Sequence, residues 1–169
     1  MRPPPDPDAI DRPTVAVLSP EDRALLGATR RAVLATVSAA GRPRQVPVCF
    51  AIVDGQSGAT LYSPLDEKPK RGLDPRQLAR VRDLLDRPHV SLLADRWDED
   101  WTTLAWLRVD ATASLVEPGT PEHAQAIVAL RLRYPQYRTQ RLEVCPMIRL
   151  APTRIARWSS TDPPAGAGR

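Results

Sequence analysis

The order of strand-like and helix-like runs restricts the fold more than any other feature of this sequence. Runs rich in β-branched and apolar residues, bounded by glycine or proline turns, predict strands at 33–38, 46–53, 60–63, 90–94, 103–117, 144–150 and 154–158. The first three runs predict an antiparallel three-stranded meander, and the last two predict a closing pair. Helix-like runs leave too few βαβ units for a parallel sheet. We therefore expect a mainly β fold with flanking helices, built as a closed or nearly closed antiparallel barrel.

Three helices are predicted from capping residues and apolar spacing. Ser19 precedes Pro20 and two acidic residues, a pattern typical of an N-cap, so the first helix should run to about Thr29. A second helix is predicted over 75–86, because its apolar residues follow the 3.6-residue period. A third is predicted over 121–133.

Length and composition indicate one domain with loose ends. A chain of 169 residues that is 42% hydrophobic can bury a core without disulfides or a metal. Proline-rich residues 1–17 and small polar residues 159–169 predict flexible tails around a domain at 18–158. Cys49 and Cys145 lie far apart and no leader-like segment precedes them, so we expect a reduced, cytoplasmic protein. No apolar run is long enough to predict a membrane span.

Charge and missing motifs exclude several classes of function. The net charge is +4, which suits an anionic ligand, but the arginines are scattered, so no nucleic-acid partner is predicted. The sequence contains no dinucleotide-binding glycine motif, no phosphate-binding P-loop and no zinc-protease motif. The only two histidines, His89 and the apparently exposed His123, are expected to have surface or packing roles, and Cys49 is expected to pack. No metal site is predicted.

The stretch after the third predicted strand contains the only two lysines in the chain, Lys68 and Lys70. Pro69 lies between them and favours an extended backbone, so both side chains should project to similar sides beside Arg71. The amides at the start of the following helix could strengthen an anion site there. Two acidic residues directly before the lysines leave open the alternative of a solvated charged loop.

The sequence also resembles a known superfamily in the order and spacing of its short motifs. These motifs are Ala35-Thr36-Val37, Gly41-Arg42-Pro43, Val46-Pro47-Val48-Cys49-Phe50, Leu61-Tyr62-Ser63, KPKR and RPHVSLLAD. Over residues 19–158 the chain resembles the split β-barrel flavin and deazaflavin oxidoreductases, the pyridoxamine 5′-phosphate oxidase-like superfamily. The stretches DEKPKR, RPHVSLLADRWDEDW and LAWLRVDA are most similar to its actinobacterial branch of coenzyme F-420-dependent enzymes.

The resemblance implies a six-stranded antiparallel split β-barrel that forms a homodimer with cofactor sites at the subunit interface. The implied cofactor is coenzyme F-420, an 8-hydroxy-5-deazaflavin, with FMN as the alternative. The residues that it implies for the cofactor phosphate are Lys68, Lys70 and Arg71. Those implied for the ring are Thr36, Val46, Pro47 and Val48, and those for the ribityl chain are Tyr62, Ser63 and Pro64.

Tryptophans form a second group of candidate site residues. Trp106 and Arg108 are two positions apart on a predicted strand and should share one face, where an aromatic ring and a cation can hold a planar anionic ring. We expect this pair to reach the cofactor from the partner subunit. Trp97 and Trp101 lie in an acidic loop and either shape the substrate side or pack at the barrel end or the dimer interface.

The resulting functional prediction is an oxidoreductase that uses reduced coenzyme F-420 as hydride donor to a small, unsaturated or conjugated organic acceptor. No catalytic side chain is predicted, because the cofactor supplies the chemistry; the completing proton could come from water or from Tyr62. Two alternatives stay open. One is an FMN-dependent oxidase or reductase of the same fold, and the other is a non-catalytic protein that binds deazaflavin, flavin or haem.

Overall fold

The computed structural model describes residues 16–56, 58–65 and 74–161. The predicted phosphate ligands Lys68, Lys70 and Arg71 lie outside the described residues, as do most of the two predicted tails.

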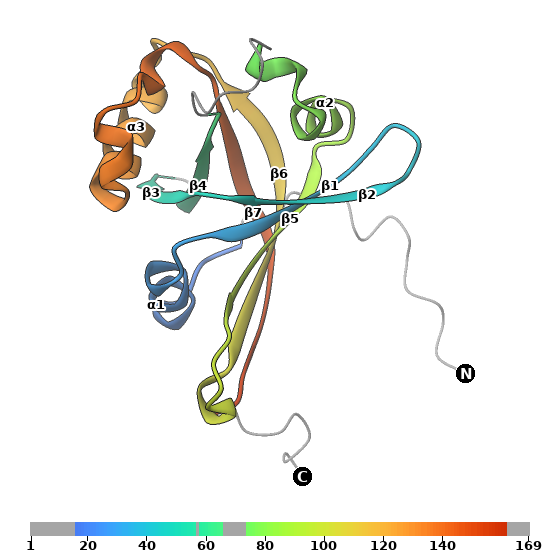
Figure 1. Cartoon of the computed structure of the whole chain (residues 1–169), viewed down its shortest axis with the longest axis vertical. Coiled ribbons are helices and arrows are strands. Elements are labelled where there is room, and N and C mark those ends of the chain that lie inside the picture. The colour runs from blue at the N-terminus through green and yellow to red at the C-terminus, as the bar shows by residue number, and fades with distance from the viewer. Residues whose placement is uncertain (1–15, 57, 66–73, 162–169) are drawn as a thin grey trace.

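The seven described strands form one antiparallel sheet in the order β2-β1-β5-β6-β7-β4-β3. Their bounds are β1 (Ala32–Val37), β2 (Pro43–Val48), β3 (Ala51–Gly55), β4 (Gly58–Pro64), β5 (His89–Arg96), β6 (Ala105–Val116) and β7 (Met147–Ser159). The mainly β class with flanking helices is confirmed. The sheet has seven strands rather than six, and it is not closed, because β2 and β3 form its two edges. Figure 1 shows β5, β6 and β7 running together to the lower end of the molecule.

The predicted three-stranded meander is correct in its two antiparallel pairings, β1 with β2 and β3 with β4, but wrong in its single central strand. The run 46–53 is divided between β2 and β3, which lie at opposite edges of the sheet. Phe50, between the two strands, is fully buried, and the hydroxyl of Tyr134 lies 3.1 Å from its backbone nitrogen and 3.0 Å from its carbonyl oxygen. Because a side chain occupies these backbone groups, the chain can leave one edge and join the other without unpaired polar atoms.

The predicted closing pair of strands is also wrong, because 144–150 and 154–158 contribute to one continuous strand, β7. This strand pairs with β6 along its whole length, and the register shifts between Asp110 and Ala111. The hydroxyl of Thr153 donates to the carbonyl oxygen of Asp110 at 3.1 Å, which fixes the irregularity. Such a bulge accommodates the buried Pro152 within a long strand.

The helices follow the capping signals closely. Ser19 caps α1 (Pro20–Ala28) in a reciprocal capping box with Asp22, and α3 (Pro121–Arg133) has the predicted bounds. The second predicted helix is interrupted at Leu78, whose backbone is extended. It consists of the 3₁₀ turn η2 (Pro75–Gln77) and α2 (Ala79–Asp86), and further 3₁₀ turns are η3 (Trp101–Thr103), η4 (Pro135–Arg138) and η5 (Leu142–Val144). No described helix is long and apolar enough to cross a membrane.

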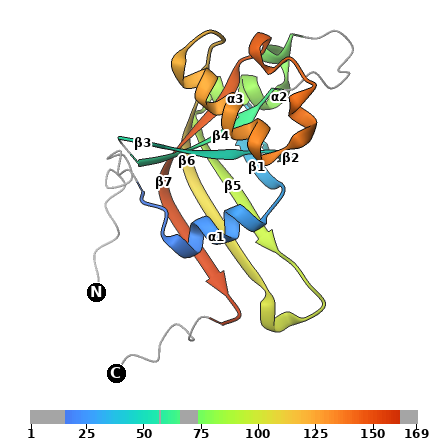
Figure 2. The ribbon, with the colours of Figure 1, turned by 90° about the vertical axis from the view of Figure 1, so that its left-hand side faces the viewer.

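The sheet has an inner face that carries the main core and an outer face that is only partly covered. The inner core includes Leu34, Leu61, Leu92, Leu107, Val109 and Leu150. Residues of α1 and α2 pack into this inner core, whereas α3 packs with Ala51 and Tyr62 of β3 and β4 on the outer face. Figure 2 shows α1 crossing the strands below the level of α2 and α3.

Candidate functional site

The outer face of β2, β1, β5 and β6 is left uncovered within the described part of the chain. Residues paired directly across antiparallel strands lie on the same face, and Pro47, Val33, Leu93 and Arg108 form one such row. Leu93 is 39% exposed although it lies in mid-sheet. We call this row, together with Trp106 and Trp158 of the adjoining row, the open face.

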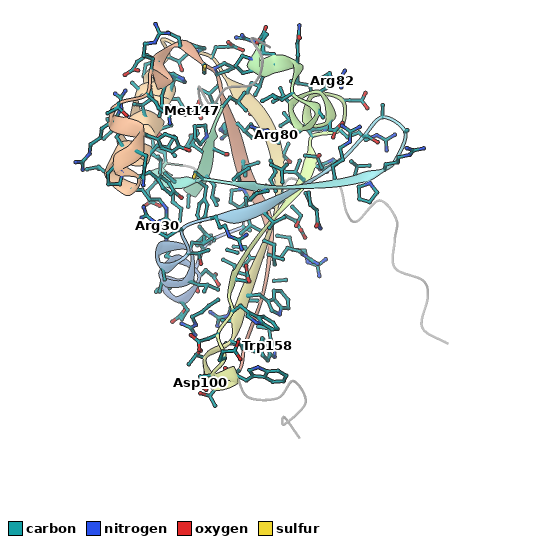
Figure 3. The ribbon with its side chains drawn as sticks, viewed as in Figure 1. Arg30, Arg80, Arg82, Asp100, Met147 and Trp158 are labelled. Carbon is teal, nitrogen blue, oxygen red and sulfur yellow. The ribbon has the colours of Figure 1, made fainter. Side chains whose placement is uncertain are left out.

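Trp106 and Trp158 lie opposite each other on β6 and β7 and continue the open face toward the far ends of these strands. They are 37% and 45% exposed. Figure 3 shows Trp158 near Asp100, at the end of the projecting strands. Trp97 and Trp101 are more exposed still, so neither packs into the barrel end of its own chain. All four tryptophans therefore lie at least partly uncovered on this projecting part of the sheet.

The predicted ring contacts on β1 and β2 are divided between the two faces. Pro47 lies on the open face, but Val46 and Val48 pack against the inner core. Thr36 is also on the inner side, where it is buried and its hydroxyl donates to Asp83 Oδ2 of α2 at 2.9 Å. The open face thus brings together Pro47, Trp106 and Arg108, and it does not include the side chains of Thr36, Val46 and Val48.

Tyr62 lies beneath α3 rather than on the open face. Its hydroxyl donates to Glu122 Oε1 at 2.7 Å, and Arg149 Nε donates to the same oxygen at 3.0 Å. Burial, reinforced by the hydrogen bond to Glu122, raises the pKa of Tyr62 to about 12. The phenol is therefore protonated at neutral pH and links β4 to α3. Ser63 and Pro64, which follow it, are buried.

A groove between the β1–β2 turn and α2 gathers arginines that sequence reasoning treated as scattered. Its volume is about 480 Å³, and its lining residues are Ser38, Ala39, Ala40, Arg42, Arg44, Arg82, Asp83 and Asp86. We call it the arginine groove; one of its lining residues, Arg82 of α2, is labelled in Figure 3.

The two acidic side chains of the arginine groove already face cations. Asp83 Oδ2 lies 3.7 Å from Arg44 Nε, and Asp86 Oδ2 lies 3.6 Å from Arg87 Nε. Within the described residues, the guanidinium groups of Arg42 and Arg82 have no ion-pair partner. No acidic side chain of the described residues therefore pairs with these two cations, and guanidinium groups bind phosphate and carboxylate strongly.

The histidines and cysteines do not form a reactive site in the described part of the chain. His123 is buried rather than exposed, and its Nε2 lies 2.9 Å from the carbonyl oxygen of Cys145, so the packing role is confirmed. His89 is exposed at the start of β5. Cys49 and Cys145 are half-buried and form no disulfide. No cluster of three or more metal-ligating side chains occurs among the described residues.

Solved structures of other proteins share this fold. HutZ, a haem storage protein from Vibrio cholerae, is 22% identical, with a TM-score of 0.60 over 85% of this chain and 95% of its own. A conserved hypothetical protein from Mycobacterium tuberculosis is 18% identical, with a TM-score of 0.64 over 89% of each chain. A FAD-binding protein from Mesorhizobium loti is 20% identical, with a TM-score of 0.57 over 83% of this chain and 94% of its own.

At these identities the solved structures establish a shared fold. No curated protein matches the sequence. The pyridoxamine 5′-phosphate oxidase family matches residues 18–159, which include every described strand and helix. This chain therefore belongs to the pyridoxamine 5′-phosphate oxidase family.

Proposed function

We propose that this protein is an oxidoreductase that binds coenzyme F-420 between two copies of the chain and uses its reduced form as hydride donor to a small, conjugated organic acceptor. The observation that carries the proposal is the arginine groove, where Arg42 and Arg82 have no ion-pair partner within the described residues. Uncompensated guanidinium groups fit a phosphorylated cofactor.

The position of the groove relative to the open face supports this assignment. Both features adjoin β2, an edge strand, with Arg44 at the groove and Pro47 on the open face. They are three positions apart, about 10 Å, and point to opposite faces of this edge strand, so a cofactor that joins them would pass around the edge of the sheet. This span is similar to the reach of the ribityl phosphate chain of a flavin or deazaflavin, so the anion and the ring could lie at the two ends of β2.

A second copy of the chain is proposed to cover the open face. Leu93, Trp106 and Trp158 are large apolar side chains that stay substantially exposed, and Arg108 lies among them. A patch of this composition, apolar with an arginine, is typical of protein interfaces. In a symmetric dimer of this kind, we propose that Trp106 and Arg108 reach the ring bound by the partner.

When bound in its reduced form, the deazaflavin supplies a hydride at low potential. The chain's own residues would bind and orient: Arg42 and Arg82 hold the anionic part, and Pro47, Trp106 and Arg108 border the ring. Tyr62 is a poor proton donor, because its pKa is about 12 and its hydroxyl already donates to Glu122. We therefore assign the completing proton to water.

The segment that contains Lys68 and Lys70 is also part of the proposal, as a second site for an anionic group of the cofactor. Coenzyme F-420 carries a polyglutamate tail in addition to its phosphate, whereas FMN has only the phosphate. The arginine groove and the predicted ligands Lys68, Lys70 and Arg71 together provide enough basic residues for a cofactor that has two anionic parts. FMN needs fewer of these residues.

An FMN-dependent oxidase or reductase is the second candidate, favoured by the FAD-binding relative from Mesorhizobium loti. Haem storage, the role named for HutZ, has less support here. The buried Nε2 of His123 is already engaged by a carbonyl oxygen, which leaves His89 as the available histidine of the two.

A parallel fluorescence titration with coenzyme F-420 and FMN tests the cofactor assignment. We expect coenzyme F-420 to bind at micromolar concentration and FMN to bind more weakly. The Lys68→Ala/Lys70→Ala variant should weaken F-420 binding by about tenfold or more, because each charge-assisted contact contributes about 1.5–3 kcal/mol. Tight binding of FMN without binding of F-420 would show that the cofactor is wrong.

Turnover needs a separate assay. Oxidation of reduced coenzyme F-420 should accelerate when conjugated acceptors such as α,β-unsaturated carbonyl compounds are added with the protein. Tight cofactor binding with no turnover for any acceptor in a broad panel would instead support a carrier role.

A further inference from the structure

A second groove lies between α1 and the projecting ends of β5, β6 and β7, away from the arginine groove. It has a volume of about 320 Å³. We call it the α1 groove; its lining residues are Glu21, Asp22, Ala24, Leu25, Ala28, Arg96, Ala105, Arg157, Trp158, Ser159 and Thr161. The space exists because small side chains face each other, Ala24 and Ala28 on the helix and Ala105 on the sheet. Pockets of this size accommodate small organic molecules.

Asp22 gives this groove a polar atom without a hydrogen-bond partner. Its side chain is only 6% exposed, and Oδ2 accepts a hydrogen bond from the backbone nitrogen of Ser19 at 2.9 Å. Oδ1 is buried and accepts no hydrogen bond within the described residues. The nearest cationic atom, Arg157 Nη1, lies 3.7 Å away, which is too far for a hydrogen bond. A buried carboxylate oxygen of this kind is unusual and favours a donor.

The charges around the groove indicate what kind of donor fits. Arg157 Nη1 lies 3.5 Å from Glu21 Oε2, and Arg96, whose Nε donates to the carbonyl oxygen of Thr103, also lines the groove, so the lining contains two carboxylates and two guanidinium groups. A full cation at Asp22 would be repelled by the adjacent Arg157, and an anion would be repelled by Asp22 itself. A neutral N–H or O–H donor is repelled neither by Arg157 nor by Asp22.

We propose that the α1 groove binds a small neutral molecule that donates a ring N–H or O–H to Asp22 Oδ1 and packs its apolar body against Ala24, Leu25 and Ala28. The site lies on the inner side of the sheet and shares no lining residue with the arginine groove. It is therefore separate from the arginine groove, although Trp158 of the open face also lines it.

Indole and 1-methylindole form a matched pair of probes, since only indole has the N–H donor. Titration of the ¹⁵N-labelled full-length protein should shift the amides of Ala24 and Ala105 with indole. The affinity for indole should exceed that for 1-methylindole by at least about tenfold, as expected for a hydrogen bond to a carboxylate.

Three variants separate this site from nonspecific binding. Asp22→Asn should remove the preference for indole, because the amide oxygen can keep the Ser19 contact while the amide nitrogen faces the groove. Ala24→Leu should fill the groove and abolish binding of both probes. Gly27→Ala, on the same helix but outside the lining, is the control and should leave binding unchanged; a methyl group there meets no atom within 4 Å.

The proposal fails if indole and 1-methylindole bind equally to the native protein. It also fails if Ala24→Leu, shown to be folded by circular dichroism, binds indole as the native protein does, or if the shifted amides lie outside the groove.

Discussion

The family resemblance and the structure give Thr36 two different roles. Resemblance assigns it to the cofactor ring, whereas in the structure its hydroxyl donates to the buried Asp83 at 2.9 Å. The Thr36→Val variant keeps the β-branched shape and removes only the hydroxyl. We expect it to lower stability and to leave the affinity for coenzyme F-420 within about twofold of native, since no contact with the cofactor is lost.

The size of the stability loss follows from the surroundings of Asp83. A hydrogen bond to a charged group contributes about 1.5–3 kcal/mol. The Asp83 side chain is 6% exposed, so water cannot replace the lost donor. Arg44, at 3.7 Å, still compensates part of the charge, although its own side chain is 42% exposed and screened. We therefore expect a loss in the lower half of that range, about 1.5–2 kcal/mol, and a fall in Tm of about 3–8 °C.

Urea denaturation followed by tryptophan fluorescence measures this change, and the m-value should stay constant. Thr112→Val is the control: Thr112 is half-buried on β6, and its side chain makes no hydrogen bond within the described residues. The reasoning is refuted if Thr36→Val changes stability by less than about 0.5 kcal/mol while the affinity for coenzyme F-420 falls tenfold. That result would indicate that the Thr36 hydroxyl contacts the cofactor.

Three further predictions concern the β2–β3 junction, the α3 contact and the open face. Tyr134→Phe removes the partner of the buried Phe50 amide and should lower the free energy of unfolding by about 2–3 kcal/mol in the same urea assay; an unchanged midpoint would contradict it. The folded state binds the Tyr62 proton more tightly than the unfolded chain does, so native stability should decrease as pH rises from 10 to 12, and Tyr62→Phe should lack this component. An identical alkaline decrease in both proteins would exclude the predicted pKa. Leu93→Glu places a charge in the open face and should give a monomer in analytical ultracentrifugation where the native protein is a dimer; a native monomer, or a dimer in both, would contradict the proposed interface.

The sequence correctly predicted those helices and strand faces that depend on interactions between residues close together in the chain. The capping box at Ser19 depends on residues three positions apart, and the bounds of α3 follow from its own residues, so both were predicted correctly. Trp106 and Arg108 share the outer face, as strand periodicity requires. Such features need no knowledge of distant contacts.

Pairing between distant segments was predicted less well. The division of 46–53 into two strands depends on Tyr134, which is 84 residues from Phe50 in the sequence. No local pattern indicates that contact. The continuous β7 was missed because Pro152 is typical of a strand end, and a bulge opposite β6 accommodates it.

The arginine groove also could not be predicted from residues that are neighbours in the sequence. Arg42 comes from a strand turn and Arg82 from a helix, so their proximity is a consequence of the fold. The only local signal is the pair Arg42 and Arg44 on either side of Pro43, and in a sequence with scattered arginines this pair does not differ from surface charge. Their lack of partners within the described residues is also a consequence of the fold, in which Asp83 faces Arg44 and Asp86 faces Arg87.

The central claim is that the arginine groove binds the anionic part of the cofactor, and charge-matched variants test it most directly. Arg42→Ala/Arg82→Ala and the control Arg31→Ala/Arg138→Ala each remove two positive charges, and both control arginines are exposed and do not line the groove. In a fluorescence titration with coenzyme F-420, the groove variant should bind at least about tenfold more weakly than native, and the control within about twofold. Equal affinities in the two variants would contradict the claim, because binding would then depend on net charge or on neither pair.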